Sequence, residues 1–111
     1  MTAARAPIRD LDEALNRLVA EVRPRKVILF GSHASGRARP GSDLDLLVVA
    51  DLDGDPDDRI RAVSRALRPR AVPLDILVYT QAEFRRFSAD PDSFLRHILD
   101  TGKIVYEAPD C

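Results

Sequence analysis

The sequence contains a single cysteine, Cys111, which is its last residue. One cysteine cannot form a disulfide within the chain or a cysteine metal site, which suits a reducing cytoplasm. No apolar run reaches the roughly 18 residues that a membrane span needs, and residues 1–7 lack the apolar core of a secretion signal. We therefore expect a cytoplasmic protein with no membrane segment.

The sequence also lacks an excess of positive charge. Its 17 Lys and Arg and 18 Asp and Glu give a net charge of −1. Direct nucleic-acid binding is therefore not expected, because it requires a clear cationic excess. With 111 residues, 45% hydrophobic and 32% charged, the chain suits one soluble domain that buries its own core. We expect a single domain over residues 1–111, and a homo-oligomer is left open.

Apolar periodicity predicts alternating helices and strands. Leucines and valines at helical spacing predict an amphipathic helix over residues 10–23. Other helices are expected at 32–38 and 56–68, from Thr80 onward behind a Thr-x-x-Glu capping box, and from Asp90 to Gly102. Short β-rich runs predict strands at 26–30, 43–49, 74–79 and 103–106. The predicted fold is α/β (α+β), a small mixed sheet of three to four strands flanked by helices.

Three aspartates occupy strand positions that are normally apolar. Asp43 and Asp45 are two residues apart and therefore share a face, and Asp75 is second in the next strand. Two like charges about 5 Å apart repel by roughly 3 kcal/mol at an effective dielectric near 20. Three carboxylates would raise one another's pKa values or bind a cation. Because Mg²⁺ prefers few carboxylates together with phosphates, we predict a site for one or two Mg²⁺ and a polyphosphate.

Gly31 and Ser32 supply a candidate phosphate site between a buried strand and a short helix. Free backbone N–H groups at such a helix start attract anions, and glycine permits a close approach. A Gly-Ser step alone is a weak signal, since it occurs in many turns. Arg37, in the following loop, could clamp a phosphate, although such arginines are more often solvated. His33 is more easily explained as a surface residue.

The two halves of this site meet only in one topology. Gly31 follows the end of strand 26–30, whereas Asp43 and Asp45 begin strand 43–49, so these strands must be antiparallel if they are neighbours. Asp75 begins strand 74–79, which must then run parallel to strand 43–49. The helix at 56–68 provides the connection, which should cross over right-handed.

Residues 31–49, GSHASGRARPGSDLDLLVV, resemble the signature of the DNA polymerase beta-like nucleotidyltransferase superfamily. They are most similar to its minimal nucleotidyltransferases, where ten residues separate Gly-Ser from Asp-x-Asp, as residues 33–42 do here. Gly36 and Ser42 also fall where that signature often has glycine and serine. Asp75 corresponds to the family's third acid, and the ending FLRHILDTGKIVYE is similar to its final helix and strand. The resemblance covers nearly the whole chain.

The resemblance implies a nucleotidyltransferase fold and metal-dependent transfer of a nucleoside monophosphate from a triphosphate. Asp43 and Asp45 would hold Mg²⁺ against the triphosphate, and Asp75 would help bind a second ion and act on the acceptor hydroxyl. Gly31, Ser32 and Ser42 would hold the β and γ phosphates, with Arg37 as a further phosphate contact.

Small size narrows the acceptor. Family members that act on nucleic acids or drugs carry extra domains, and this chain has no room for one. Stand-alone members resemble antitoxins that adenylylate a tyrosine of a partner HEPN-type ribonuclease toxin. We therefore expect ATP as co-substrate and such a toxin as partner. Two alternatives stay open: transfer to a small-molecule hydroxyl, such as that of an aminoglycoside, and a non-catalytic module that neutralises its partner by contact.

Overall fold

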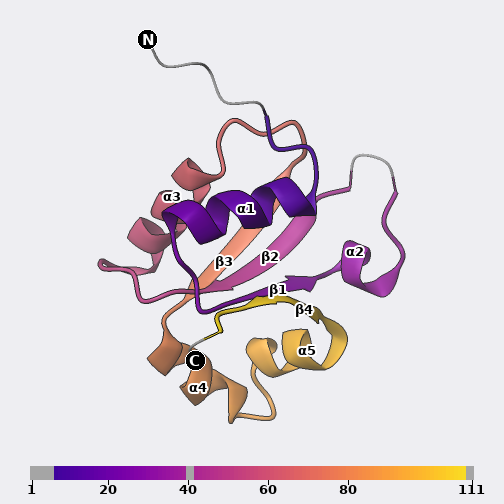
Figure 1. The fold of residues 1–111 in the computed structure, drawn as a ribbon. Helices are drawn as coiled ribbons and strands as arrows, with labels where there is room; N and C mark the ends of the chain where they lie inside the picture. Colours follow the sequence, from indigo (N-terminus) through magenta and orange to yellow (C-terminus); the bar gives the residue numbers. More distant parts are fainter. Residues whose placement is uncertain (1–6, 40–41, 110–111) are drawn as a thin grey trace.

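The computed structural model describes residues 7–39 and 42–109 (Figure 1). The helices are α1 (Leu11–Glu21), α2 (Ser32–Ser35), α3 (Pro56–Ala66), α4 (Gln81–Ser88) and α5 (Phe94–Thr101). The strands are β1 (Lys26–Phe30), β2 (Leu44–Val49), β3 (Leu74–Tyr79) and β4 (Lys103–Glu107). Most bounds agree with the sequence-based expectations within two residues. The expected turn over 39–41 lies mostly outside the described residues, as does Cys111.

The four strands form one mixed sheet in the order β3-β2-β1-β4. β1 pairs with β2 antiparallel, and this register places Phe30 opposite Asp45. β2 pairs with β3 parallel and places Asp45 opposite Asp75. The predicted antiparallel and parallel pairings are both confirmed, so the start of β2, the start of β3 and the end of β1 share one edge of the sheet.

Helices cover both faces of the sheet (Figure 1). On one face, Leu44, Leu46 and Val48 of β2 join a buried core with residues of α1 and α3. On the other face, Leu47 and Val49 pack with buried residues of α5. β2 is therefore buried on both sides along its second half, as expected for a central strand. By the same alternation, Asp45 points toward the face that α4 and α5 cover.

Two predicted helix bounds are wrong. The short helix expected over 32–38 ends at Ser35, because Gly36 adopts φ 78 and turns the chain out of the helix. The last helix begins at Phe94 rather than at Asp90. Asp90 instead accepts a hydrogen bond from the Asp92 N–H (3.0 Å) in a turn, and the Ser93 hydroxyl caps the helix by accepting from the Arg96 N–H (3.0 Å).

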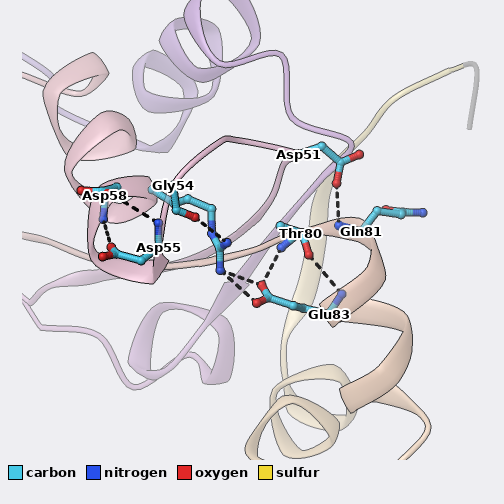
Figure 2. Close-up of polar contacts among 8 residues, drawn as sticks. Asp51, Gly54, Asp55, Asp58, Thr80, Gln81 and Glu83 are labelled. Atoms are coloured by element: carbon cyan, nitrogen blue, oxygen red, sulfur yellow. Dashed lines mark hydrogen bonds and ion pairs between the residues drawn. The ribbon is translucent and has the colours of Figure 1, made fainter.

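A polar network ties α3 to α4 where β2 and β3 end (Figure 2). The Thr80 hydroxyl and the Glu83 carboxylate form the predicted capping box of α4. Glu83 also accepts two hydrogen bonds from Nη2 of Arg59, at 2.8 and 3.0 Å. Arg59 is only 7% exposed, and its Nη1 donates to the Gly54 carbonyl (3.3 Å). This buried arginine was not predicted from the sequence, and it fixes the two helices at the edge of the sheet opposite the aspartates.

Among the described residues, no helix is long and apolar enough to cross a membrane.

Candidate active site

The site is built on the step from β1 into α2. Gly31 follows β1 with φ 75 and ψ −152, a left-handed conformation that glycine adopts most readily. Its carbonyl accepts hydrogen bonds from the N–H groups of Ala34 and Ser35, both at 3.1 Å. Because α2 is a single turn, the expected contribution of a helix dipole here is small. Any phosphate would depend on the backbone N–H groups and on the Ser32 hydroxyl.

Gly31 lies directly against the carboxylate of Asp45. A Cβ added at Gly31 would collide with Oδ2 of Asp45 and would lie 2.9 Å from its Cγ. Glycine is therefore required at position 31 for two reasons, the backbone conformation and the neighbouring carboxylate. The half of the motif proposed for phosphate and the half proposed for metal are therefore in contact.

The three aspartates lie at the same end of the sheet. Asp45 is half-buried at the start of β2, Asp75 is its exposed partner on β3, and Asp43 is exposed one residue before β2. The pKa of Asp45 is raised above its ordinary value, first by burial and then by the negative charges of Asp75 and Asp43. These carboxylates repel one another, as their sequence positions predicted.

Carboxylate oxygens are the ligands that a hard divalent cation prefers, and a cation would relieve the repulsion that raises the pKa of Asp45. The donor set at this edge therefore fits Mg²⁺. Among residues 7–39 and 42–109, however, no three acidic, histidine or cysteine side chains converge closely enough to form a complete metal site. A Mg²⁺ ion at this position would need substrate phosphates and water as further ligands, which is common for this ion.

His33 lies at the site, whereas its sequence position alone favours a surface residue. Its Nε2 lies 3.2 Å from the Ser42 carbonyl oxygen, and its charge lowers the pKa of Asp45, against the larger effects that raise it. His33 thereby joins α2 to the residue just before Asp43. Its place in the Gly-Ser motif was the only sequence signal, and that signal does not reveal the long-range contact.

Ser42 and Arg37 both make hydrogen bonds within the segment that joins α2 to β2. The Ser42 hydroxyl accepts a hydrogen bond from the Arg39 N–H (2.8 Å), and the Ser42 N–H donates to the Arg39 carbonyl (2.9 Å). Ser42 therefore shapes the loop that leads into β2. Arg37 is exposed, and its backbone N–H donates to the Ser32 carbonyl (2.9 Å). Phosphate contacts for both residues stay predictions.

Comparison with known proteins agrees with this architecture. Residues 13–110 match the family model described as polymerase beta, nucleotidyltransferase. A protein of Methanocaldococcus jannaschii, MJ0604, named as a candidate protein adenylyltransferase, is 33% identical over 98 residues. That alignment covers 86% of this chain and 94% of the relative.

Solved structures share the fold. A toxin–antitoxin crystal structure with AMP-PNP matches with a TM-score of 0.60 at 19% identity, covering 89% of this chain and 75% of the other. A candidate nucleotidyltransferase of Sulfolobus solfataricus gives 0.59 at 22% identity, covering 86% and 75%. A crystal structure of a mutant toxin–antitoxin MntA–HpeT gives 0.59 at 17% identity, covering 89% and 73%. At these identities the likeness establishes the fold alone.

Proposed function

Since this chain belongs to the polymerase beta nucleotidyltransferase family, we propose that it transfers AMP from ATP to a hydroxyl group of a partner protein, with Mg²⁺ as cofactor. The hydroxyl oxygen would bond to the α-phosphorus, and the bond from that phosphorus to the β-phosphate would break and release pyrophosphate. The observation that carries the proposal is the contact of Gly31 with Asp45, together with the pairing of Asp45 and Asp75. One short edge thus offers an anion-accepting backbone beside carboxylates that need a cation. A nucleoside triphosphate with its metal satisfies both.

Asp43 and Asp45 are the proposed metal ligands on the triphosphate side. They lie two residues apart at the start of β2, and Asp45 touches the Gly-Ser step. Bound divalent cations would neutralise phosphate charge and make the attacking oxygen more nucleophilic. By holding the metal, the two aspartates would keep the triphosphate beside the Gly-Ser step.

Asp75 is the proposed residue for the acceptor. It is exposed on β3, on the opposite side of β2 from the strand that leads to Gly31. An incoming hydroxyl can therefore reach Asp75 without displacing the phosphates. We assign Asp75 to orienting that hydroxyl and taking its proton, and to helping hold a second ion.

Gly31 and Ser32 are the proposed contacts of the β and γ phosphates, through backbone N–H groups and the Ser32 hydroxyl. Arg37 is exposed near the same turn, and its guanidinium would pair with a terminal phosphate oxygen. Ser42 would act mainly through the loop that it shapes, by way of its hydrogen bonds with Arg39.

The proposed acceptor is a tyrosine of a HEPN-type ribonuclease toxin, in the cytoplasm. The relative MJ0604 is named as a candidate protein adenylyltransferase, and two of the structures that share this fold are toxin–antitoxin crystal structures. We also propose that residues 13–110, which match the family model, belong to a single domain. We propose that another chain supplies the acceptor hydroxyl.

The test is transfer of label from α-³²P-ATP in the presence of Mg²⁺, with a purified HEPN-type toxin as acceptor. We expect a labelled toxin band with the parent protein and none with the Asp43→Asn, Asp45→Asn double variant. Asp92→Asn, which changes an exposed aspartate of the α4–α5 turn, is the control and should label the toxin normally. Equal labelling by the double variant would refute the proposed mechanism, and a labelled small molecule in a lysate would redirect it to another acceptor.

A further inference from the structure

A cavity of about 370 Å³ lies beside Gly31, where α5 packs against the end of β1. The residues around it that matter here are Phe30, Gly31, Ser35, Phe94, His97 and Thr101. Its volume falls within the range of roughly 300–1,000 Å³ that is usual for ligand sites. Gly31 therefore borders two features, this cavity and the carboxylate of Asp45.

Phe94 presents an aromatic ring at this cavity. The residue is 58% exposed although it begins helix α5. Its ring is held edge-to-face against Phe30, with centroids 6.4 Å apart and planes at 90°. Phe30 is in turn the partner of Asp45 across the β1–β2 pair. Phe30 thus links the exposed ring of Phe94 to Asp45, the proposed metal ligand.

Polar groups of α5 line another part of the same cavity. His97 and Thr101 are one helical turn apart, and the Thr101 hydroxyl donates to the His97 carbonyl (2.9 Å). The imidazole of His97 and the hydroxyl of Thr101 can each donate or accept a hydrogen bond. The cavity therefore combines a flat apolar surface with hydrogen-bonding groups.

We propose that this cavity binds the nucleoside part of the triphosphate, with the base stacked on Phe94 and the ribose hydroxyls or base edge near His97 and Thr101. The inference rests on the proposed function, which places the phosphates at Gly31. A nucleoside has the flat aromatic ring and the hydroxyl groups that this lining accommodates, and Gly31 makes the cavity continuous with the phosphate site. Stacking on an aromatic side chain holds any base, because every base has an aromatic face.

The test uses isothermal titration of the full chain in Mg²⁺ with two probes. The first is an ATP analogue with a methylene group between the α and β phosphorus atoms, which cannot transfer AMP. The second is inorganic tripolyphosphate, which lacks the nucleoside. Phe94→Ala should weaken binding of the ATP analogue about tenfold and leave binding of tripolyphosphate unchanged. Phe94→Tyr should restore the parental affinity, because it keeps a ring that can stack.

Phe87→Ala is the matched control. Phe87 is also an exposed phenylalanine, 37% exposed on α4, but it does not line this cavity. We expect it to bind both probes as the parent does.

Two results for Phe94→Ala would overturn the inference. The variant could lose affinity for both probes equally, which would assign Phe94 to the phosphate site or to folding. It could instead bind the ATP analogue like the parent, which would exclude stacking on Phe94; slower transfer to the partner protein in that case would make α5 an acceptor-docking surface. If the parent bound neither probe, the proposed function itself would fail, and the inference with it.

Discussion

Acidic side chains lie at both ends of the β2–β3 strand pair, but their surroundings shift the pKa values of these side chains in opposite directions. Where the strands end, Glu83 accepts hydrogen bonds from the Thr80 N–H and from Arg59, and its pKa is lowered, first by the bond from Thr80. Where the strands begin, Asp45 faces Asp75, and its pKa is raised by burial and by neighbouring negative charge. One end uses carboxylates to stabilise the fold, and the other holds them where they repel.

Acids placed together at a cost to stability are a common feature of functional sites, because the missing counter-charge arrives with the substrate. The network around Asp51 shows the opposite arrangement. Asp51 accepts from the Gln81 N–H (2.9 Å) and pairs with Arg25 (3.0 Å). The comparison therefore predicts that changes at the start of the strands affect activity, whereas changes at their ends affect folding.

The largest expected effect is that of Asp75→Asn on AMP transfer. If Asp75 acts on the attacking hydroxyl, its contribution lies mainly in the transition state. We expect transfer to fall by about a thousandfold or more, while Mg-ATP still binds within a few-fold of the parent. Calorimetric titration and a transfer assay on the same preparation separate the two. Transfer at the parental rate would leave Asp75 as a simple strand-edge carboxylate.

At the other end, Arg59→Ala should mainly reduce stability. Removing one member of a buried ion pair costs about 3–5 kcal/mol. Because Glu83 keeps 34% side-chain exposure, we expect about 2–3 kcal/mol, measured by urea unfolding. Arg61→Ala is the control, since Arg61 pairs with Asp58 on the surface (3.2 Å), where such pairs contribute about 0–1 kcal/mol. Equal losses in the two variants would contradict the structural role of Arg59.

The arrangement of side chains at the start of β2 and β3 can be predicted from the sequence better than the arrangement at the ends of these strands. Asp43 and Asp45 share a face because strand side chains alternate, and the helix at 56–68 forces Asp75 onto a parallel neighbour. Both inferences need only local periodicity and topology rules, and the observed pairing of Asp45 with Asp75 agrees with them. The contact of His33 with Ser42 (3.2 Å) depends on how a loop folds back, which periodicity does not encode.

The burial of Arg59 could not be predicted from the sequence either. Its partner Glu83 is 24 residues away, on a helix whose position depends on packing. An arginine on an amphipathic helix is normally exposed, so only the docked arrangement of α3 and α4 reveals the exception. The sequence also predicts the wrong start for α5. Asp90 and Ser93 are both good capping residues, and in the fold Ser93 caps the helix.

A smaller effect is expected from the contact between Gly31 and Asp45, and Gly31→Ala tests whether the two halves of the site truly touch. The substitution meets backbone strain at φ 75 and a collision with Asp45. Gly36→Ala is the control, because Gly36 has a similar φ of 78 but no neighbouring atom within 4 Å of an added Cβ. Left-handed strain costs about 1–2 kcal/mol, so Gly36→Ala, at φ 78 and ψ 11, should lose about that much. Gly31→Ala should lose more, because φ 75 with ψ −152 is a conformation that essentially only glycine adopts and because the added Cβ meets Asp45.

In an Asp45→Ala background, the part of the loss that comes from the collision should disappear, about 1 kcal/mol, leaving only the backbone strain at Gly31. Urea unfolding of the four corners of this cycle measures the coupling. A coupling near zero would mean that Asp45 moves aside readily and that the contact does not constrain the site.

The smallest expected effect concerns pH, and it has opposite signs at the two ends. Because the pKa of Asp45 is raised from 3.8 on folding, its ionisation destabilises the fold as pH rises through the raised value. Asp45→Asn should therefore increase the metal-free melting temperature at pH 7 by a few degrees, and this gain should vanish near pH 3.5.

The pKa of Glu83 is lowered from 4.5, so its ionisation stabilises the fold above that pH. Glu83→Gln should decrease the melting temperature at pH 7, and the loss should shrink as pH falls below 4.5. Scanning calorimetry of both variants across pH 3–8 would measure the two slopes, and slopes of the same sign would remove the distinction between the acids that stabilise this fold and those that await a cation.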